Sequence, residues 1–430
     1  MTRSFLGTPA TAPGPLGPQM LRSTMMIRRD PLAFLAQMRD DYGDVVQFPI
    51  PRPATYLVAS ASATQQVLVG RPGGYDKDTI QYRSLSLVTG DGLLTATNDH
   101  WRGQRPVVQP AFHHSFLPAV GEVVAQETGW LIDRWGGLPA GAVVDVELAM
   151  MDLALRVVGR CLFADDLRGS TAALAHATLE ALDVVIKRSR VPIAIPAAWP
   201  TPANRRLDRS MRALESAVER LMTQRNPEPG STLLLDLILS QPDWSRRQMR
   251  DQIVTFLVAG HETAASAMTW ALWLLARDPD RQVPPSGVSA ANHARACAEE
   301  ALRLFPPAWV ISRNAVLADE IEGIEIPAGA LVITSPFLLH RDSRYWPDPD
   351  RFDPGRFADR LAAAQRAAYL PFGAGPRLCI GRDFARWEMT QVIEQLLAAF
   401  EWSVVTPQPP MLPSVTLRPV GGLQLAISRR

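Results

Sequence analysis

The 430-residue sequence contains only three cysteines, and no two of them form a CxxC pair. This scarcity excludes a disulfide framework, and it leaves no closely spaced thiols for a structural zinc site. Lysine is also rare, because Lys77 and Lys187 are its only occurrences and the other basic residues are arginines. The 44 basic residues are balanced by 43 acidic ones, for a formal net charge of +1. Nucleic-acid binding requires a clustered basic excess and is therefore not expected.

Long apolar runs are absent as well. No segment reaches the ~18 consecutive apolar residues that a membrane span needs. Residues 1–20 are rich in proline and glycine and lack the apolar core of a signal peptide. We therefore expect a reduced, cytoplasmic protein without a membrane anchor. Residues 1–30 are predicted to form a Pro-rich N-terminal extension, and the absence of a low-complexity linker predicts one large domain over residues 31–430.

The hydrophobic pattern predicts a mainly α fold with small β-sheets at its edges. Residues 30–42 carry apolar side chains at helical spacing. Between residues 101 and 275 the chain is predicted to be helical with breaks at proline and glycine, one of them at residues 191–202. Short strands are predicted at residues 45–48, 56–58, 309–311, 330–333 and 423–427, the last as a terminal hairpin strand after Gly421-Gly422.

Two predicted helices matter most for function. The first covers residues 246–276, begins at a capping box of Ser245 and Gln248, and would extend roughly 46 Å. Its apolar side chains cover more than one face, so it is expected to run through the middle of the domain. The second covers residues 381–400 and follows the most informative stretch of the sequence.

That stretch, residues 372–381, reads FGAGPRLCIG. Gly373 and Gly375 predict a tight loop in which the backbone approaches another group closely. Cys379 then falls at the start of a helix, where free N–H groups and the nearby Arg377 are expected to lower the thiol pKa. A thiolate here is a candidate metal ligand or nucleophile, although no local histidine could serve as a base. The alternative is an inert, buried packing cysteine.

The pattern F-x-x-G-x-R-x-C-x-G resembles the cytochrome P450 family, the haem-thiolate monooxygenases, and specifically their soluble bacterial members. The resemblance implies that Cys379 is the axial ligand of the iron of haem b (iron protoporphyrin IX), whose O–O cleavage a thiolate favours. It further implies that Phe372 packs near the sulfur, that Arg377 pairs with a haem propionate, and that Gly381 lets the helix lie close to the porphyrin.

The first long helix contains the sequence AGHETA at residues 259–264. Gly260 costs ~1 kcal/mol relative to alanine inside a helix, and a gap for a ligand would explain it. The Thr263 hydroxyl can bond the carbonyl of Ala259 and produce a local kink. Glu262 beside it could relay protons. This resembles the acid–threonine pair that serves O2 activation in the family; the alternative is a packing notch beside a surface glutamate.

Further motifs fit the same resemblance. Glu300 and Arg303 form an E-x-x-R pair on a helix, and the family joins such a pair to a later arginine, here Arg356, in a buried triad. Trp101 and Arg105 match a W-x-x-x-R motif directed at a haem propionate. Two further propionate contacts are implied, Arg313 and His340. The segment between residues 278 and 300 is shorter than is usual in the family.

By resemblance, the substrate pocket is lined by Ala259, Gly260, Trp309 and Val310, within segments 82–94, 182–198, 259–263, 308–311 and 420–423. The expected function is oxidation of a lipophilic small molecule with O2 in bacterial specialised metabolism. Electrons would come from NAD(P)H through a separate ferredoxin and reductase, with Arg382 and Arg386 as contacts for an acidic partner, and the protein is expected to be a monomer. The alternatives are a haem-thiolate peroxygenase or isomerase, and a non-catalytic haem-binding protein.

Overall fold

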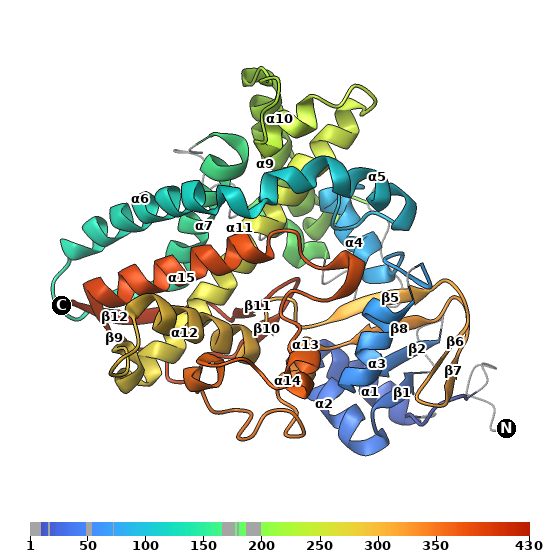
Figure 1. Cartoon of the computed structure of the whole chain (residues 1–430). Coiled ribbons are helices and arrows are strands. Elements are labelled where there is room, and N and C mark those ends of the chain that lie inside the picture. Colours follow the sequence, from blue (N-terminus) through green and yellow to red (C-terminus); the bar gives the residue numbers. More distant parts are fainter. Residues whose placement is uncertain are drawn as a thin grey trace.

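The computed structural model describes residues 10–15, 18–48, 54–71, 73–165, 177–178, 180–185 and 199–430. Helices make up most of this part of the chain. The sheet that contains β1 and the sheet that contains β12 lie toward opposite ends of the molecule (Figure 1). The predicted mainly α fold with small sheets is confirmed. The predicted loop at residues 191–202 lies mostly outside the described residues.

The helices have these bounds in chain order: α1 Pro18–Arg29, α2 Pro31–Tyr42, α3 Ala61–Gln65, α4 Ile80–Thr89, α5 Asn98–Val108, α6 Leu117–Gly136, α7 Val146–Phe163, α9 Pro202–Gln224, α10 Leu234–Leu239, α11 Arg246–Arg277, α12 Ala290–Leu304, α13 Pro336–Leu339, α14 Ala363–Ala368 and α15 Arg382–Ala399. The shorter helical turns include Pro279–Gln282, Pro354–Phe357 and Gly375–Arg377. Within the described residues, no helix combines the length and hydropathy that a membrane span requires.

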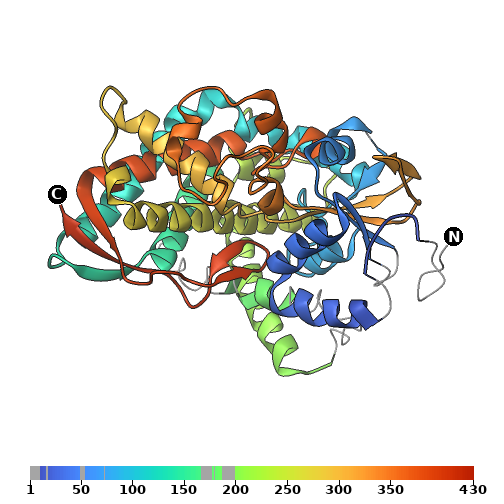
Figure 2. The same cartoon turned by 90° about the horizontal axis from the view of Figure 1, so that it is seen from below.

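Helix α11 runs through the middle of the molecule, where it packs against α7, α12 and α15 (Figure 2). Its 32 residues extend about 48 Å at 1.5 Å per residue. The predicted capping box is present: Ser245 Oγ accepts the Gln248 N–H at 3.2 Å, and Gln248 Oε1 accepts the Ser245 N–H at 2.8 Å. Side chains around most of its circumference are buried, as the sequence predicted for a central helix.

The largest sheet has the strand order β1-β2-β8-β5-β3. Strand β2 is parallel to β8, and the other neighbours are antiparallel. The bounds of its strands are β1 Val45–Phe48, β2 Thr55–Val58, β3 Tyr75–Asp76, β5 Ile311–Ala315 and β8 Leu331–Thr334. Two hairpins are separate from it: β6 Asp319–Ile321 with β7 Ile324–Ile326, and β10 Met411–Pro413 with β11 Leu417–Pro419.

The C-terminal strand β12 (Gln424–Arg429) lies between β4 (Ala142–Asp145) and β9 (Phe400–Val404), antiparallel to both. The predicted terminal hairpin is therefore wrong, although the strand itself exists. Alternating apolar residues identify a strand, but they do not specify its partner. Both partners of β12 come from distant parts of the sequence.

Residues 10–15 and helix α1 contact the rest of the chain. The Gln47 N–H donates to the carbonyl of Pro13 at 2.8 Å, and the hydroxyls of Thr11 and Tyr56 bond at 2.7 Å. Helix α1 packs along α2. A Pro-rich segment can thus still offer its carbonyls to a neighbouring strand, and the boundary at residue 31 stays a prediction.

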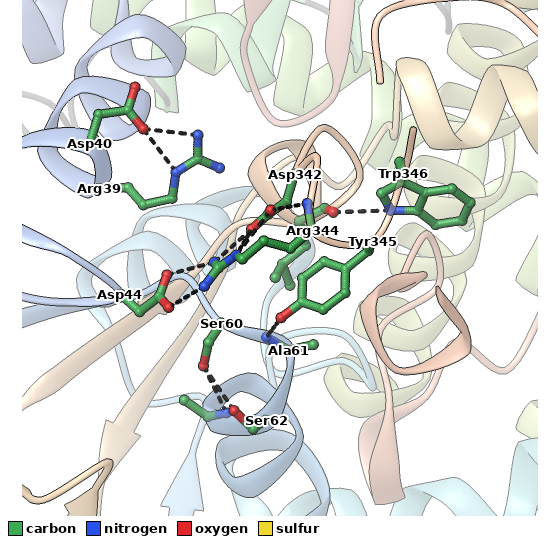
Figure 3. Close-up of polar contacts among 12 residues, drawn as sticks. Arg39, Asp40, Asp44, Ser60, Ala61, Ser62, Asp342, Arg344, Tyr345 and Trp346 are labelled. Atoms are coloured by element: carbon green, nitrogen blue, oxygen red, sulfur yellow. Dashed lines mark hydrogen bonds and ion pairs between the residues drawn. The ribbon is translucent and has the colours of Figure 1, made fainter. Parts of the chain in front are cut away.

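Arg344 joins the start of β1 to the segment that follows α13 (Figure 3). Its guanidinium donates to both oxygens of Asp44, at 2.6 and 2.8 Å, and to Asp342 at 2.6 to 3.0 Å. These hydrogen bonds raise the pKa of Arg344 above its ordinary value. The next residue, Tyr345, accepts the N–H of Ala61 on its hydroxyl at 3.2 Å. The cluster fastens the N-terminal sheet to the loops that approach the cysteine motif.

Candidate functional site

Cys379 lies in a tight loop that is closed by backbone hydrogen bonds. Its N–H donates to the carbonyl of Phe372 at 3.1 Å, and the N–H of Leu378 donates to the carbonyl of Gly375 at 3.0 Å. Gly375 has a φ of +70°, and a Cβ there would lie 2.0 Å from the carbonyl oxygen of Leu68. The loop therefore requires glycine for its backbone conformation and for close approach to a neighbouring chain segment.

The Cys379 side chain is solvent-accessible, yet the surrounding protein desolvates the thiol enough to raise its pKa above the ordinary value. The Gly381 N–H and the charges of Arg105, Lys77 and Arg382 oppose this shift. The sequence predicted a lowered pKa because it placed the sulfur at a helix N-terminus, but α15 begins three residues later. That prediction is wrong for the free thiol. A thiolate here depends on a bound cation, since a metal ion deprotonates a coordinating thiol.

Lys77 lies among three further cations, Arg105, Arg313 and Arg377, and the charges of Lys77 and Arg105 act on the Cys379 sulfur. Backbone carbonyls accept several of the hydrogen bonds that these four side chains donate. Lys77 Nζ donates to Leu94 at 2.9 Å, and Arg105 Nη1 donates to Leu378 at 3.1 Å. Lys77 and Arg313 are buried. The cluster thus presents buried positive charge that is held mainly by neutral partners, among them the side-chain oxygen of Asn98, which accepts from Arg377 at 3.0 Å.

The protein places few negative groups beside the positive charges of this cluster. Within the described residues, the cluster makes a single ion pair, between Arg377 and Asp76 at 3.9 Å, and Arg377 Nη1 is buried without a hydrogen-bond partner there. Burial lowers the pKa of Lys77 well below its ordinary value, and the charges of Arg313 and Arg377 lower it further. Burial, with Arg313, also lowers the pKa of Arg377 to about 10. Because uncompensated buried charge costs several kcal/mol, the cluster suits a ligand with more than one negative charge.

Trp101 and Arg105 lie one turn apart on α5, and the structure gives the tryptophan a further contact. The guanidinium carbon of Arg377 lies 4.6 Å from the centre of the Trp101 ring, within cation–π range. Lys77, in contrast, is a site residue that the sequence analysis missed. Its position just after β3 carries no motif, and the scarcity of lysine was the only signal available.

His340 is engaged elsewhere, so its predicted role at a propionate is wrong. Its buried ring accepts the N–H of Leu370 on Nε2 at 2.8 Å, which leaves Nδ1 to donate to the carbonyl of Arg303 at 3.1 Å. Burial, reinforced by the charge of Arg303, lowers the pKa of His340 to about 3. A neutral ring with both nitrogens bonded to backbone has no charge to offer an anion.

The structure brings Glu300, Arg303 and Arg356 together, as the E-x-x-R motif implied. Arg303 Nε and Nη2 donate to the two oxygens of Glu300 at 2.7 and 2.8 Å, and Arg356 Nε lies 3.4 Å from the same carboxylate. Glu300 and Arg303 are fully buried. Arg303 also donates to three backbone carbonyls, those of His340, Pro349 and Arg351. The group therefore locks residues 340–356 onto α12.

Phe372 is covered by Arg386 of α15, whose guanidinium carbon lies 5.2 Å from the centre of its ring. Arg386 also pairs with Glu299 at 2.7 Å, and Arg382 pairs with Asp383 at 2.8 Å. The two arginines proposed as contacts for an acidic partner thus already have partners within the chain. Arg386 in particular supports the ring beside the cysteine loop.

On α11 the structure confirms the predicted threonine hydrogen bond. Thr263 Oγ1 donates to the carbonyl of Ala259 at 2.8 Å, and α11 is continuous through these residues. A Cβ at Gly260 would lie 2.9 Å from Cγ2 of Val158 on α7. The glycine therefore permits close packing of α11 against α7 on this side of the helix. Glu262 is buried, so the surface glutamate of the packing-notch alternative is not observed, and the gap for a ligand at Gly260 stays a prediction.

Glu262 is buried and faces the β10–β11 hairpin, where its Oε1 accepts the hydroxyl of Thr416 at 2.9 Å. Burial raises its pKa to about 7, although the charge of Arg418 and the bond from Thr416 oppose the shift. A carboxyl group that titrates near neutral pH suits proton transfer.

Two further predicted pocket residues, Trp309 and Val310, pack against the protein core. Trp309 is buried, and its Nε1 donates to the carbonyl of Ser414 at 2.9 Å. It belongs to an apolar cluster with α2 and β1, against which the half-buried Val310 also packs. Trp309 therefore packs in the core, and its place in the substrate pocket stays a prediction. Residues 186–198 of the predicted pocket lie outside the described residues.

Comparison with known proteins is decisive for the family. The sequence model of the cytochrome P450 family matches residues 12–283 and 292–425. Cyclooctat-9-en-7-ol 5-monooxygenase of Streptomyces melanosporofaciens is 32% identical over 410 residues, covering 90% of this chain and 88% of that protein. Pentalenene oxygenase of Streptomyces avermitilis is 30% identical, with 95% and 93% covered. The crystal structure of CYP175A1 from Thermus thermophilus matches with a TM-score of 0.82 at 31% identity, with 96% and 99% covered.

This chain belongs to the cytochrome P450 family. It is accordingly a haem-thiolate monooxygenase, a class of enzyme that binds haem b and oxidises small molecules with O2. The electrons for this reaction derive from NAD(P)H and reach the enzyme through redox partners.

The residues of this cytochrome P450 fit haem b on structural grounds. The group needs a ligand for its iron and counter-charges for its two propionates. Cys379 offers an accessible sulfur on a loop, and the cation cluster offers buried positive charge, including the unpartnered Arg377 Nη1. Lys77, Arg105, Arg313 and Arg377 are therefore the residues suited to hold the propionates.

The family match is interrupted at residues 284–291, within the segment that the sequence marked as shortened. Here only the turn Pro279–Gln282 separates α11 from α12. A cavity of about 260 Å³ borders this segment, with Val283, His293 and Leu397 among its lining residues. None of the predicted site residues lines this cavity.

Proposed function

We propose that this cytochrome P450 oxidises a lipophilic cyclic terpenoid in bacterial specialised metabolism. The support comes from the relatives, since cyclooctat-9-en-7-ol 5-monooxygenase, cyclooctatin synthase and pentalenene oxygenase, all from Streptomyces, are named for such compounds. We further propose that the enzyme acts as a monomer in the cytoplasm and receives its electrons from a ferredoxin and an NAD(P)H-dependent reductase.

One observation carries the catalytic part of the proposal: an accessible sulfur on a glycine-rich loop beside four poorly compensated cations. When bound, haem b supplies an iron centre for the reduction and insertion of oxygen, to which a thiolate donates electron density. Cys379 ligates the iron, and the cation cluster holds the propionates. Trp101 keeps Arg377 in place through its ring.

Two residues of α11, Thr263 and Glu262, take part in proton transfer in this proposal. The hydrogen of the Thr263 hydroxyl is committed to the carbonyl of Ala259, which leaves the lone pairs of its oxygen free to accept a hydrogen bond. Glu262 holds and releases a proton at its carboxyl group near neutral pH. Ala259 and Val310, both only partly buried, remain the proposed contacts of the substrate.

The test is a set of optical titrations of the haem-loaded protein with cyclic terpenes and terpene alcohols, with fatty acids and aromatic compounds as comparison classes. We expect a high-spin shift with a cyclic terpenoid, and a product containing one added oxygen when a ferredoxin, its reductase and NADPH are supplied. A shift confined to fatty acids or aromatics would overturn the substrate class.

The same assay separates the alternative functions. Product formation from hydrogen peroxide alone, equal to that with reductant and O2, would identify a peroxygenase. Conversion without any oxidant would identify an isomerase. A ligand that shifts the spectrum but is never converted would identify a non-catalytic haem protein.

A further inference from the structure

One face of α11 fastens the β10–β11 hairpin to the core. Glu262, Ser266 and Trp270 follow one another at intervals of four residues, so they lie along a single face of the helix. Thr416 donates its hydroxyl to Glu262 at 2.9 Å, and Ser266 Oγ and Trp270 Nε1 both donate to the carbonyl of Leu417, at 2.7 and 2.8 Å. Glu262 therefore helps to hold the β10–β11 hairpin against α11.

The next residue of the hairpin links this attachment to a second buried carboxylate. Arg418 Nε donates at 2.7 Å to Glu147, in the first turn of α7. The Glu147 side chain is 6% exposed, and that of Arg418 is 17% exposed. Asp145, the half-buried N-cap of α7, is two residues from Glu147 along the chain. Because Arg418 is partly exposed, its ion pair with Glu147 connects this buried region to solvent.

The Arg418 guanidinium acts on two buried carboxyl groups, those of Glu262 and Glu147. Burial raises the pKa values of Glu262 and Glu147, and Arg418 opposes both shifts. The charge of Glu147 adds to the shift of Glu262, and that of Asp145 adds to the shift of Glu147. From α11 itself, His261 is neutral near pH 7, because burial lowers its pKa to about 4. The positive charge of Arg418 therefore favours the deprotonated form of Glu262.

We propose that Arg418 and Glu147 are positioning residues that control whether Glu262 holds its proton, with Thr416 fixing the carboxyl toward them. Arg418 stays with Glu147 while Glu262 is protonated. When Glu262 gives its proton to a water molecule on the Thr263 side of the helix, which becomes hydronium, Arg418 shifts toward the new carboxylate. The carboxylate then recovers one proton from a solvent hydronium ion on the hairpin side, so the protein gains and loses no net proton.

The use of this control in catalysis rests on the proposed function, but the control itself is measurable without substrate or reductase. The measurement is an infrared pH titration of the Glu262 carboxyl stretch in the haem-loaded ferric protein. The band is assigned by its disappearance in Glu262→Gln. The variants are Arg418→Gln and Glu147→Gln. The matched control is Arg246→Gln, which removes an exposed ion pair with Glu219 at the start of α11.

We expect Arg418→Gln to raise the titration midpoint by at least about one pH unit, a tenfold change in proton affinity. We expect Glu147→Gln to lower the midpoint by a similar amount, because it removes a negative charge and frees Arg418 for Glu262. Arg246→Gln should leave the midpoint unchanged. General loosening of the hairpin would hydrate Glu262 and lower the midpoint in both variants, so shifts of the same sign, or no shifts, would overturn the proposal.

Thr416 provides a second test that preserves the ion pair. Thr416→Val removes only the hydroxyl and should raise the midpoint, whereas Thr416→Ser should restore it. An unchanged midpoint in Thr416→Val would contradict the proposed role of Thr416. If these shifts occur but no cyclic terpenoid binds, the substrate proposal fails and the inference stands. Terpenoid oxidation without these shifts would instead support the substrate proposal and overturn the inference.

Discussion

Replacing Gly375 by alanine is the sharpest test of how the cysteine loop is built. The residue adopts a φ of +70°, and its new Cβ would lie 2.0 Å from the carbonyl oxygen of Leu68. The left-handed conformation costs an alanine about 1–2 kcal/mol. Forcing two backbone segments apart costs about 1–3 kcal/mol more. We therefore expect Gly375→Ala to lower the free energy of unfolding by roughly 2–5 kcal/mol.

Gly373→Ala is the matched control, because Gly373 lies two residues away with a φ of +71°. Its Cβ would meet only Ile311 Cδ1, at an ordinary 3.8 Å. This variant should lose only the conformational part, about 1–2 kcal/mol. Urea denaturation followed by tryptophan fluorescence compares the two, and the fraction of protein with a sulfur-ligated carbonyl spectrum reports the position of Cys379. Equal destabilisation by both variants would refute the claim that contact with Leu68 defines the loop.

Other parts of the site give further predictions. Lys77→Met should stabilise the haem-free protein, because it relieves repulsion among buried cations. It should also speed the transfer of haem to apomyoglobin roughly tenfold or more, because it removes a charge-assisted hydrogen bond to the haem. Slower transfer would contradict a role of Lys77 at a propionate. Glu300→Gln should destabilise the fold by about 3–5 kcal/mol in urea, because it leaves the buried guanidinium of Arg303 uncompensated. His340 stays neutral when folded, with a pKa lowered to about 3, so the unfolded chain binds more protons below pH ~6.5 and stability should fall as the pH drops toward 3. A His340→Gln variant should show a shallower acid slope, and an equal slope would show that His340 does not cause it. Thr263→Val should keep the stability but divert NADPH oxidation toward hydrogen peroxide, and unchanged coupling would favour the peroxygenase alternative.

The sequence predicted those elements whose signals are local. The capping box of Ser245 and Gln248 and the apolar residues that follow it predicted a helix over residues 246–276. The observed helix α11 begins at the same residue and ends one residue later, at Arg277. The bond from Thr263 to Ala259 also follows from spacing alone, because residues four apart always meet on a helix. Short-range geometry thus transfers directly from sequence to structure.

Features that depend on distant contacts were missed or assigned incorrectly. Gly260 matches a motif, but only the structure shows that its neighbour is Val158 of α7. His340 carries an ionisable ring, yet burial against the backbone keeps it neutral. Lys77 joins the site only because β3 places it beside Arg313 and its neighbours. The direction of the Cys379 pKa shift likewise depends on desolvation, which no motif encodes.

The central claim is that the Cys379 sulfur ligates the iron of haem b. The most direct measurement is the absorption spectrum of the reduced, carbon monoxide-bound protein after expression with a haem precursor. The wild type, Cys161→Ser and Cys297→Ser should all show the red-shifted Soret band of thiolate ligation, whereas Cys379→Ser should lose it. Retention of that band in Cys379→Ser, or its absence from the wild type, would contradict the account.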